Sequence, residues 1–315
     1  MTIERVCILG AGAVGASIAS IIADARTAAA SRDAGADRPP EVTLIADGER
    51  AQRLRANGIV VNGRHYRLPV TDDAETQLII VAVKSTQLDA ALPLLGRAAG
   101  RSAIVMSLLN GITSEDAIAA AIGPDRVVPA MILGIDAMGE GDGFRYLNRG
   151  TIHYGSDPSR HPVSGEAMDA IARCFDAAGL PYSISDDITR TLWWKFMINV
   201  GINQASAVLR GEYGLFQRSP HARELMRDAM HEVIELSRVE GTGLTDADID
   251  AWDRTLMGLN PAGRTSMLQD VVAGRPTEVD LFAGTVLEIA ARHGIDVPVN
   301  RTLYQIIRAI ETGKT

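Results

Sequence analysis

Three polar residues recur at every fourth position in an otherwise apolar segment, RTLWWKFMINVGINQASAVL (190–209). Steps of four place Lys195, Asn199 and Asn203 along one side of an α-helix. An ammonium group in an apolar surround can be tuned to donate a proton near neutral pH, and amides can hydrogen-bond a polar ligand without adding charge. The ordinary alternatives are a lysine that extends to solvent from a buried stem, and asparagines bonded to neighbouring backbone. The spacing alone leaves both interpretations open.

A glycine-rich segment follows the first strand-like run, RVCIL. It has the pattern GxGxxG and stands directly between a strand and a helix. Its glycines would permit a tight turn, close approach of backbone to a pyrophosphate, and tight packing of helix on strand. A glycine turn that serves packing alone is the alternative. The strand–helix context favours a dinucleotide site, whose residues would be Gly10, Ala11, Gly12, Ala13, Val14 and Gly15.

The second strand-like run, EVTLIAD, ends at Asp47. An acid there can accept hydrogen bonds from the adenosine ribose and repels a 2′-phosphate, which favours NAD(H) over NADP(H). Asp47 lies 32 residues beyond Gly15, and the low-complexity segment 24–40 is expected to form a lengthened, mobile loop between them. Asp47 could instead simply cap the following turn, and Arg50 and Arg53 could still hold a phosphate.

The elements that must position these residues change in type near residue 187. Before it, helix-like segments alternate with apolar strands, as in a parallel sheet covered on both faces. Residues 58–70 alternate and contain Asn-Gly, which predicts a hairpin. The predicted fold is α/β, with an N-terminal Rossmann-type doubly wound parallel sheet (1–186) followed by an all-α C-terminal domain (187–315). Helical patterns in the second part cover 187–209, 219–241, 245–258, 264–273, 277–293 and 299–311.

Composition narrows the class of protein. The chain has 315 residues, 46% hydrophobic and 22% charged, with a net charge of −8. The acidic balance argues against nucleic acid or an anionic membrane as a partner. Two cysteines, Cys7 and Cys174, and six scattered histidines predict neither a disulfide framework nor a metal site. Residues 6–22 are apolar enough to resemble part of a signal peptide, but the basic flank is weak, so the expected location is cytoplasmic.

Five segments, in chain order, resemble the ketopantoate reductase family (2-dehydropantoate 2-reductases). They are the GxGxxG, VAVKS (81–85), LLNGI (108–112), WWKFMINVGINQ (193–204) and RTSMLQDVVAGRPTEVDLFAG (264–284). The resemblance runs over essentially the whole chain, and the last two segments are long and specific. It implies a Rossmann domain, a helical domain, and reduction of a 2-keto acid to its 2-hydroxy acid with NADPH, a step of pantothenate biosynthesis.

Roles for individual residues follow from this resemblance. Lys195 matches the catalytic lysine, which would donate a proton to the keto oxygen, and Glu278 would tune that lysine or bind a substrate hydroxyl. Lys84 matches a lysine beside the cofactor, and Asn110 an asparagine between substrate and nicotinamide. The further substrate-binding residues implied are Asn199, Asn203 and Ser266.

The order of residues around Ser266 and Glu278 constrains both. Gly274 and Pro276 separate them, so Thr265 or Ser266 is expected to begin one helix and Thr277 to cap the next, with Asp280 as its partner. Taken alone, Ser266 could be a helix cap, and Glu278 could simply pair with a helix dipole.

Asp47 departs from the family, which usually has an arginine at the end of the second strand. This departure hints at NADH and a different 2-keto acid. Three interpretations follow: a reductase of the 2-dehydropantoate type forming the D-2-hydroxy acid, an NADH-preferring D-2-hydroxy acid dehydrogenase of the same family, and a non-catalytic dinucleotide sensor. Apolar faces on the C-terminal helices would also allow a homodimer.

Overall fold

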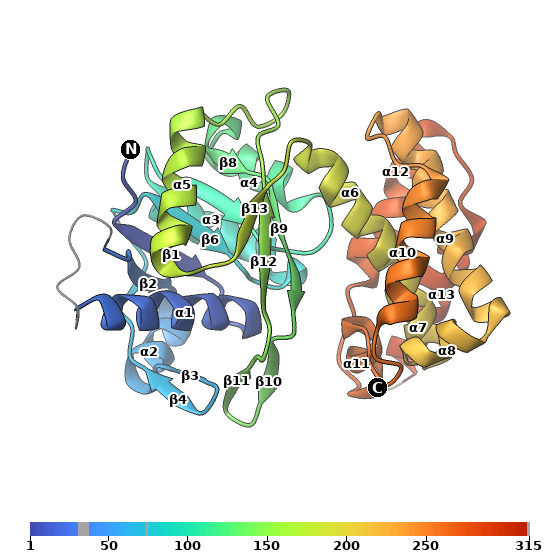
Figure 1. Cartoon of the computed structure of the whole chain (residues 1–315), viewed down its shortest axis with the longest axis horizontal. Helices are drawn as coiled ribbons and strands as arrows, with labels where there is room; N and C mark the ends of the chain where they lie inside the picture. The colour runs from blue at the N-terminus through green and yellow to red at the C-terminus, as the bar shows by residue number, and fades with distance from the viewer. Residues whose placement is uncertain (31–37, 74, 314–315) are drawn as a thin grey trace. The chain divides into compact units, whose positions relative to one another are not determined.

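The computed structural model describes residues 1–30, 38–73 and 75–313 (Figure 1). Their contacts divide the chain into two compact units. The first comprises Met1–Leu109 and Thr113–Ile188, and the second comprises Asn110–Ile112 and Thr189–Thr315. The short segment Asn110–Ile112 therefore belongs with the second unit, although it lies within the sequence of the first.

A six-stranded parallel sheet forms the centre of the first unit, in the order β5-β2-β1-β6-β7-β8. The order reverses at β1, as in dinucleotide-binding Rossmann sheets. The bounds are β1 (Arg5–Leu9), β2 (Glu41–Ile45), β5 (Val70–Thr71), β6 (Leu78–Val81), β7 (Ile104–Ser107) and β8 (Val127–Val128).

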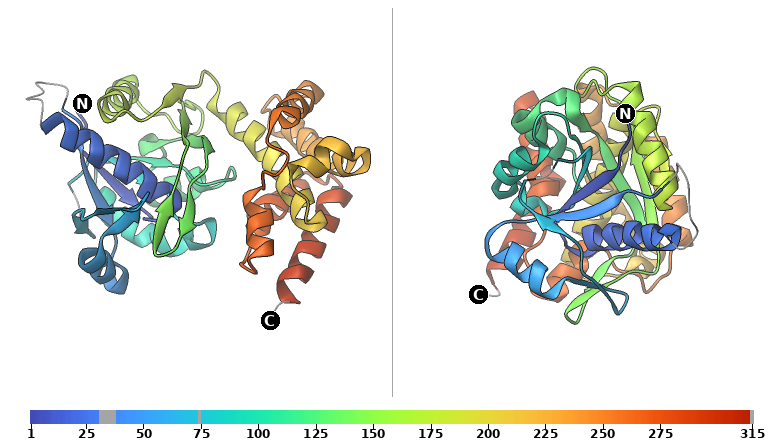
Figure 2. Two further views of the ribbon diagram at one scale, coloured as in Figure 1. Left: turned by 60° about the horizontal axis from the view of Figure 1, so that its bottom comes forward. Right: turned by 90° about the vertical axis from the view of Figure 1, so that its left-hand side faces the viewer.

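Alternate residues of these strands enter two separate hydrophobic cores, because successive side chains point to opposite faces. Val6 and Ile8 pack with α1 (Ala13–Ala30) and α5 (Gly165–Ala178), whereas Cys7 and Leu9 pack with α3 (Leu88–Ala99) and α4 (Ser114–Ile122). Figure 2 shows these helix pairs on either side of the strands. The prediction of a doubly wound sheet is confirmed.

Two smaller sheets complete the unit. The predicted hairpin is present as β3 (Ile59–Val61) and β4 (Arg64–Tyr66), in a second sheet with β10 (Met138–Glu140) and β11 (Gly143–Arg145). The third sheet joins β9 (Ala130–Ile135), β12 (Arg149–Tyr154) and β13 (Tyr182–Ile184). The remaining helical segments of the unit are α2 (Gly48–Asn57), η1 (Ser85–Gln87) and η2 (Pro124–Arg126).

The prediction of a loop over residues 24–40 is wrong for residues 24–30, which continue α1. The run ARTAAA has high intrinsic helix propensity because alanine loses little side-chain entropy in a helix. Residues 31–37 lie outside the described part of the chain.

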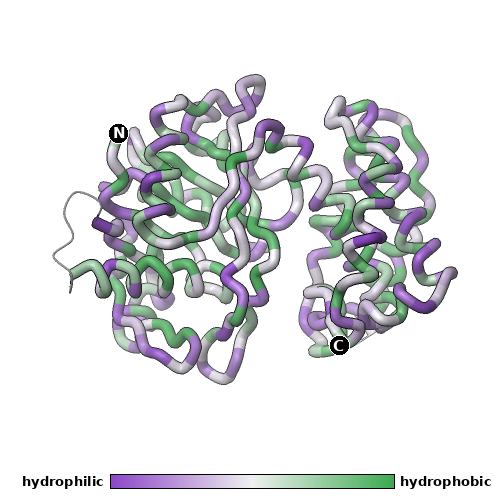
Figure 3. Tube along the Cα trace, viewed as in Figure 1, coloured by the Kyte–Doolittle hydropathy of each residue, from purple (hydrophilic) through white to green (hydrophobic). Residues whose placement is uncertain are grey.

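The second unit is helical, as predicted. After α6 (Ile188–Ile198) the chain passes through η3 (Asn199–Asn203) into α7 (Gln204–Leu209). The helices alternate hydrophilic and hydrophobic residues along their length, as amphipathic helices around one core do (Figure 3). The others are α8 (Tyr213–Arg218), α9 (Pro220–Glu240), α10 (Asp246–Gly258), α11 (Ser266–Val272), η4 (Asp280–Gly284), α12 (Thr285–His293) and α13 (Pro298–Thr312).

Candidate active site

The glycine-rich loop joins β1 to α1, and each glycine meets a different constraint. Gly10 has φ +106°, and a Cβ there would lie 2.5 Å from the Val83 backbone nitrogen. A Cβ on Gly15 would lie 2.1 Å from the Gly10 carbonyl oxygen. A Cβ on Gly12 would have no atom within 4 Å. The fold thus requires glycine at positions 10 and 15, while nothing in the described chain requires it at position 12.

An open position 12 at the start of α1 fits a dinucleotide pyrophosphate. The Ala16 N–H donates to the Gly12 carbonyl oxygen at 2.8 Å, so the helix begins here. The first N–H groups of a helix lack intrahelical acceptors and point toward its N-terminus, where the helix dipole favours an anion. Ala11, Gly12, Ala13 and Val14 are partly exposed. The residues present therefore fit a bound phosphate group, and a side chain at position 12 would occupy its space.

Asp47 follows β2 by two residues and pairs with a residue far along the chain. Its Oδ2 accepts from Arg97 Nη2 at 3.0 Å, and about half of each side chain is exposed. Asp47 occupies the N-cap position of α2 but makes no side-chain capping bond, which weakens the alternative that it is only a cap. A single arginine in the last turn of α3 carries no sequence signal, so Arg97 was not predicted.

The other candidate phosphate ligands lie in α2 and after β6. Burial lowers the pKa of Arg50, and the positive charge of Arg53 adds to that effect. Lys84 follows β6, is exposed, and occupies the N-cap position of η1. The backbone of Val83 lies against Gly10, so Lys84, the next residue, lies close to the glycine-rich loop.

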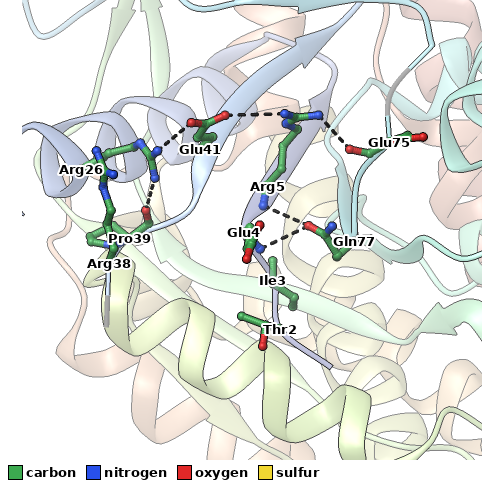
Figure 4. Close-up of a pocket in the computed structure, with 10 residues that line it drawn as sticks. All are labelled: Thr2, Ile3, Glu4, Arg5, Arg26, Arg38, Pro39, Glu41, Glu75 and Gln77. Atoms are coloured by element: carbon green, nitrogen blue, oxygen red, sulfur yellow. Dashed lines mark hydrogen bonds and ion pairs between the residues drawn. The ribbon is translucent and has the colours of Figure 1, made fainter. Parts of the chain in front are cut away.

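A separate hollow of about 550 Å³ opens at the amino ends of the strands, opposite the end that carries the glycine-rich loop (Figure 4). Its lining includes Arg5 and Glu41, at the starts of β1 and β2. Glu41 pairs with Arg26 at 2.7 Å and with Arg5 at 3.7 Å. Dinucleotides bind at the carboxyl ends of such strands, so this internally paired hollow is not the dinucleotide site.

Lys195, Asn199 and Asn203, hereafter the stripe, lie where α6 gives way to a π-helical turn. Lys195, in the last α-helical turn, and Asn199 are half-buried, and Asn203 is 6% exposed. Asn203 Nδ2 donates to Asn199 Oδ1 at 3.0 Å. The prediction of one continuous α-helix over 187–209 is therefore wrong at residues 199–203, which form η3.

The π turn improves the alignment of the stripe. In an α-helix, four residues rotate about 40° past a full turn, so three members would drift around the surface. A turn closed by i→i+5 bonds contains more residues, so the step from Asn199 to Asn203 does not add to that drift. Gly201 lets η3 approach α9, since a Cβ there would lie 2.5 Å from Met230 Cε.

Ser266 joins this stripe from another helix. Ser266 is exposed, and its Oγ donates to Asn203 Oδ1 at 3.3 Å. Thr265 is the N-cap of α11 and accepts from the Leu268 N–H at 3.1 Å. The alternative that Ser266 itself caps the helix is wrong, because Thr265 does so. Asn199, Asn203 and Ser266 thus form one hydrogen-bonded set.

Glu278 and Asn110 form a second pair in the same unit. Asn110 Nδ2 donates to Glu278 Oε2 at 2.9 Å, although 168 residues separate them. Gly111, with φ +87°, follows Asn110, and a Cβ there would lie 2.6 Å from Leu281 Cδ1. This close approach fixes the loop of Asn110 against the start of η4. Both predicted residues therefore come together.

Thr277 pairs with Glu311 and not with the expected Asp280. Its backbone N–H and Oγ1 both donate to Glu311 Oε1 at 2.7 Å. Asp280 instead accepts from Tyr304 Oη at 2.8 Å. The segment after Glu278 is a π turn, η4, rather than a regular first turn of α-helix, so a capping box with Asp280 does not form.

Two kinds of site are absent from the parts of the chain that the structure describes. Residues 1–30, 38–73 and 75–313 contain no group of three or more His, Cys, Asp or Glu side chains arranged to hold a metal ion. No helix within those ranges is long and apolar enough to cross a membrane.

Comparison with known proteins places this geometry among enzymes of one class. The chain is 28% identical over 315 residues to the 2-dehydropantoate 2-reductase of Halobacterium salinarum, covering 96% of this chain and 98% of that protein. It is 28% identical over 323 residues to the same-named enzyme of Archaeoglobus fulgidus, covering 99% and 100%.

Solved structures show the same fold. A PanE/ApbA family ketopantoate reductase from Ralstonia eutropha JMP134 superposes with a TM-score of 0.81 at 28% identity, over 98% of this chain and 99% of that one. A D-mandelate dehydrogenase described with NADH and anilino(oxo)acetate gives a TM-score of 0.83 at 22% identity, over 98% and 99%. Residues 6–158 match the family Ketopantoate reductase PanE/ApbA, and residues 187–311 match its C-terminal part. The first match includes the glycine-rich loop, and the second includes Lys195, Asn199 and Asn203. Because both parts match in order, the chain belongs to the ketopantoate reductase PanE/ApbA family.

Proposed function

We propose that this protein reduces a 2-keto acid of the 2-dehydropantoate type to the D-2-hydroxy acid, using NAD(P)H. The observation that carries the proposal is Lys195 in α6, which continues directly into the turn of Asn199 and Asn203, where Ser266 of α11 completes the hydrogen-bonded set. This set offers amide and hydroxyl groups beside an ammonium, which suits a substrate that has both a carboxylate and a keto oxygen.

Residues 1–186 bind the dinucleotide in this proposal, and residues 187–315 bind the keto acid and perform the proton transfer. The N–H groups at the start of α1 hold the pyrophosphate, with Asp47 at the adenosine ribose and Lys84 and Asn110 toward the nicotinamide. When bound, the reduced nicotinamide would supply a hydride to the keto carbon.

Lys195 then donates a proton to the keto oxygen as general acid, where negative charge develops. Asn199, Asn203 and Ser266 bind and orient the keto acid through neutral hydrogen bonds. Glu278, whose carboxylate is held by Asn110, binds a substrate hydroxyl or tunes the protonation of Lys195.

The proposed cofactor is NADH in preference to NADPH. The support is the carboxylate of Asp47 at the end of β2, which repels a 2′-phosphate. Arg97 pairs with this carboxylate, so its guanidinium is engaged by Asp47. The same residue supports the second candidate, an NADH-preferring D-2-hydroxy acid dehydrogenase of this family that acts on a different 2-keto acid.

Steady-state turnover of ketopantoate and a panel of branched and aromatic 2-keto acids, each with NADH and with NADPH, tests these proposals. We expect oxidation of NADH with at least one keto acid, and the substrate with the largest kcat/KM separates the two candidates. Oxidation of neither cofactor by any keto acid would contradict the enzyme proposal. If both dinucleotides still bound, the sensor interpretation would replace it.

We also propose that the protein is a homodimer through its helical unit. Met257 and Val272 are 53% and 60% exposed there, and burial of exposed apolar surface favours association. Light scattering after size-exclusion chromatography, at several protein concentrations, would give twice the chain mass. A constant mass of one chain would contradict the proposal.

A further inference from the structure

A buried polar cluster is centred on Gln204, the residue that follows Asn203 in the chain. Gln204 and Asn300 are both 0% exposed. Gln204 Nε2 donates to Asn300 Oδ1 at 2.9 Å. Asn300 Nδ2 donates to Glu232 Oε2 at 2.7 Å and to the Ala229 carbonyl oxygen at 3.1 Å. Three helices, α7, α13 and α9, thus meet in one network.

One bond of this network reaches the π turn itself. In a continuous α-helix the Val200 carbonyl would accept from the backbone N–H of Gln204. Here that N–H donates to the Gly201 carbonyl oxygen, and the side-chain Nε2 of Gln204 donates to the Val200 carbonyl oxygen at 2.7 Å. The side chain of Gln204 therefore takes the place of its own backbone group where the π turn gives way to α7.

The hydrogen bonds also fix which way each amide faces. Both protons of Gln204 Nε2 have acceptors, Val200 O and Asn300 Oδ1. Flipping the amide would set its oxygen against both of these oxygens. Asn300 is fixed in turn, because its amide nitrogen donates to Glu232. Glu232 is held by the Val299 and Asn300 backbone N–H groups at 2.7 and 2.9 Å.

This amide orientation lowers stability in one respect, since the Gln204 Oε1 atom is buried with no hydrogen-bond partner. A buried unsatisfied acceptor is destabilising. An apolar residue would avoid this cost but would leave the Val200 carbonyl oxygen and Asn300 Oδ1 without the donor that Gln204 supplies. The bond to Val200 is the one that reaches the π turn of Asn199 and Asn203.

We propose that Gln204, held by Asn300 and Glu232, is a positioning residue that maintains the π turn Asn199–Asn203 and so aligns the two asparagines with Lys195 for the keto acid. The catalytic consequence rests on the proposed function, whereas the structural one does not. Gln204 touches neither substrate nor cofactor in this scheme and acts through the backbone of Val200.

The test compares Gln204→Met, which keeps length and loses the amide, with a matched control, Ser237→Ala. Ser237 is 0% exposed on α9 and shares a 2.7 Å hydrogen bond with Thr242, so the control also loses a buried bond of the same unit. We expect Gln204→Met to lower kcat/KM for the keto acid by about 10–100-fold, as small displacements of positioned groups do. The Kd of the dinucleotide should not change, and Ser237→Ala should keep kcat/KM within about twofold. Equal losses in the two variants would overturn the proposal.

A double variant separates position from stability. Gln204→Met/Asn300→Leu replaces both polar partners with apolar groups of similar shape, which is often nearly neutral for stability, and Glu232 keeps its two backbone donors. Gln204→Met should lower the Tm, because Asn300 Oδ1 loses its donor. We expect the Tm of the double variant to return toward that of the wild type while kcat/KM stays low. Recovery of both together would show a merely structural role.

Hydrogen–deuterium exchange of the 199–205 amides keeps the inference testable if the wild-type protein turns over no keto acid. Faster exchange there in Gln204→Met, and not in Ser237→Ala, supports the positioning of the π turn even if the enzyme proposal has failed. Unchanged exchange in Gln204→Met overturns the inference, whatever the activity.

Discussion

Lys195 is the residue on which the proposed chemistry most depends, because it alone among the clustered side chains can carry a proton to the keto oxygen as a cation. Lys195→Ala should lower kcat by at least about 10²-fold, the usual contribution of a positioned general acid. Dinucleotide affinity should be nearly intact, since the glycine loop belongs to the other unit. Kinetics with a titration of nucleotide fluorescence measure both.

Arg254→Ala is the matched control, because it removes an exposed cation from α10 of the same unit. It should leave kcat within about twofold. A collapse of cofactor affinity in Lys195→Ala, with kcat retained at saturating cofactor, would assign Lys195 to cofactor binding instead.

Asp47 decides the choice of dinucleotide in the proposal. Asp47→Ala removes the carboxylate that repels a 2′-phosphate and releases Arg97 from its 3.0 Å ion pair. The ratio of kcat/KM for NADH to that for NADPH should fall, by about tenfold or more if the lost repulsion reaches ~1.4 kcal/mol. Asp142→Ala, an exposed acid in the β10–β11 turn, should leave the ratio unchanged. An unaltered ratio in Asp47→Ala would make Asp47 a turn residue only.

At the scale of elements, the β1–α1 loop allows a prediction in which two neighbouring glycines behave oppositely. Gly12→Ala meets open space, whereas Gly15→Ala places a Cβ 2.1 Å from the Gly10 carbonyl oxygen. Gly12→Ala should therefore keep its Tm within a few degrees yet bind dinucleotide at least about tenfold more weakly, because the methyl occupies the pyrophosphate space. Gly15→Ala should instead lose stability.

Thermal melts and dinucleotide titrations of the two glycine variants are the measurements. Since Gly→Ala within a helix is otherwise favourable by about 1 kcal/mol, a drop in Tm for Gly15→Ala isolates the clash. Unimpaired binding by Gly12→Ala would place the pyrophosphate elsewhere.

Element types were predictable from the sequence where one periodicity dominates, and less so where two structures share a pattern. Polar residues spaced four positions apart fit an α-helix and, over a single turn, also fit a π turn. The spacing therefore could not distinguish η3 from α-helix at Asn199–Asn203. Alanine-rich residues 24–30 looked like loop because they lack apolar contrast, yet continue α1. The strand β13, of three residues, is too short to show a period.

Across the whole molecule, partners distant in sequence are what the sequence could not supply. The resemblance gave Asn110 and Glu278 as site residues, but their mutual bond across 168 positions depends on the fold. The ion pair of Asp47 with Arg97 and the network of Gln204 with Asn300 arise in the same way. Residue types at a site can be predicted from local pattern, whereas hydrogen-bond partners require the packing of the chain.

The pH dependence of stability should contain opposite contributions from two neighbouring acids. Burial raises the pKa of Glu115, opposed in part by hydrogen bonds from its own backbone N–H and from Ser114. A hydrogen bond with His161 lowers the pKa of Asp116, with burial opposing and Arg160 adding to the effect. Glu115 therefore stabilises the fold fully below its unfolded pKa of about 4.3 and loses that contribution as pH rises through its folded pKa. Asp116 contributes above about pH 3.9 and loses its contribution as pH falls through its folded pKa.

Substituting each acid by its amide separates these contributions. Glu115→Gln removes the cost of a buried carboxylate, so it should raise the Tm by a few degrees near pH 7 and by progressively less as the pH falls toward 4. Asp116→Asn should lower the Tm near pH 7, with a difference that also fades in acid. Melting curves extended down to about pH 2 measure the loss for Asp116→Asn, whose contribution disappears only below about pH 3.9. Curves from about pH 4 to 8 measure the effect of Glu115→Gln. A Tm increase for Glu115→Gln that stays constant over this range would mean that the Glu115 carboxyl binds the same number of protons in the folded and unfolded states, and therefore that burial does not raise its pKa.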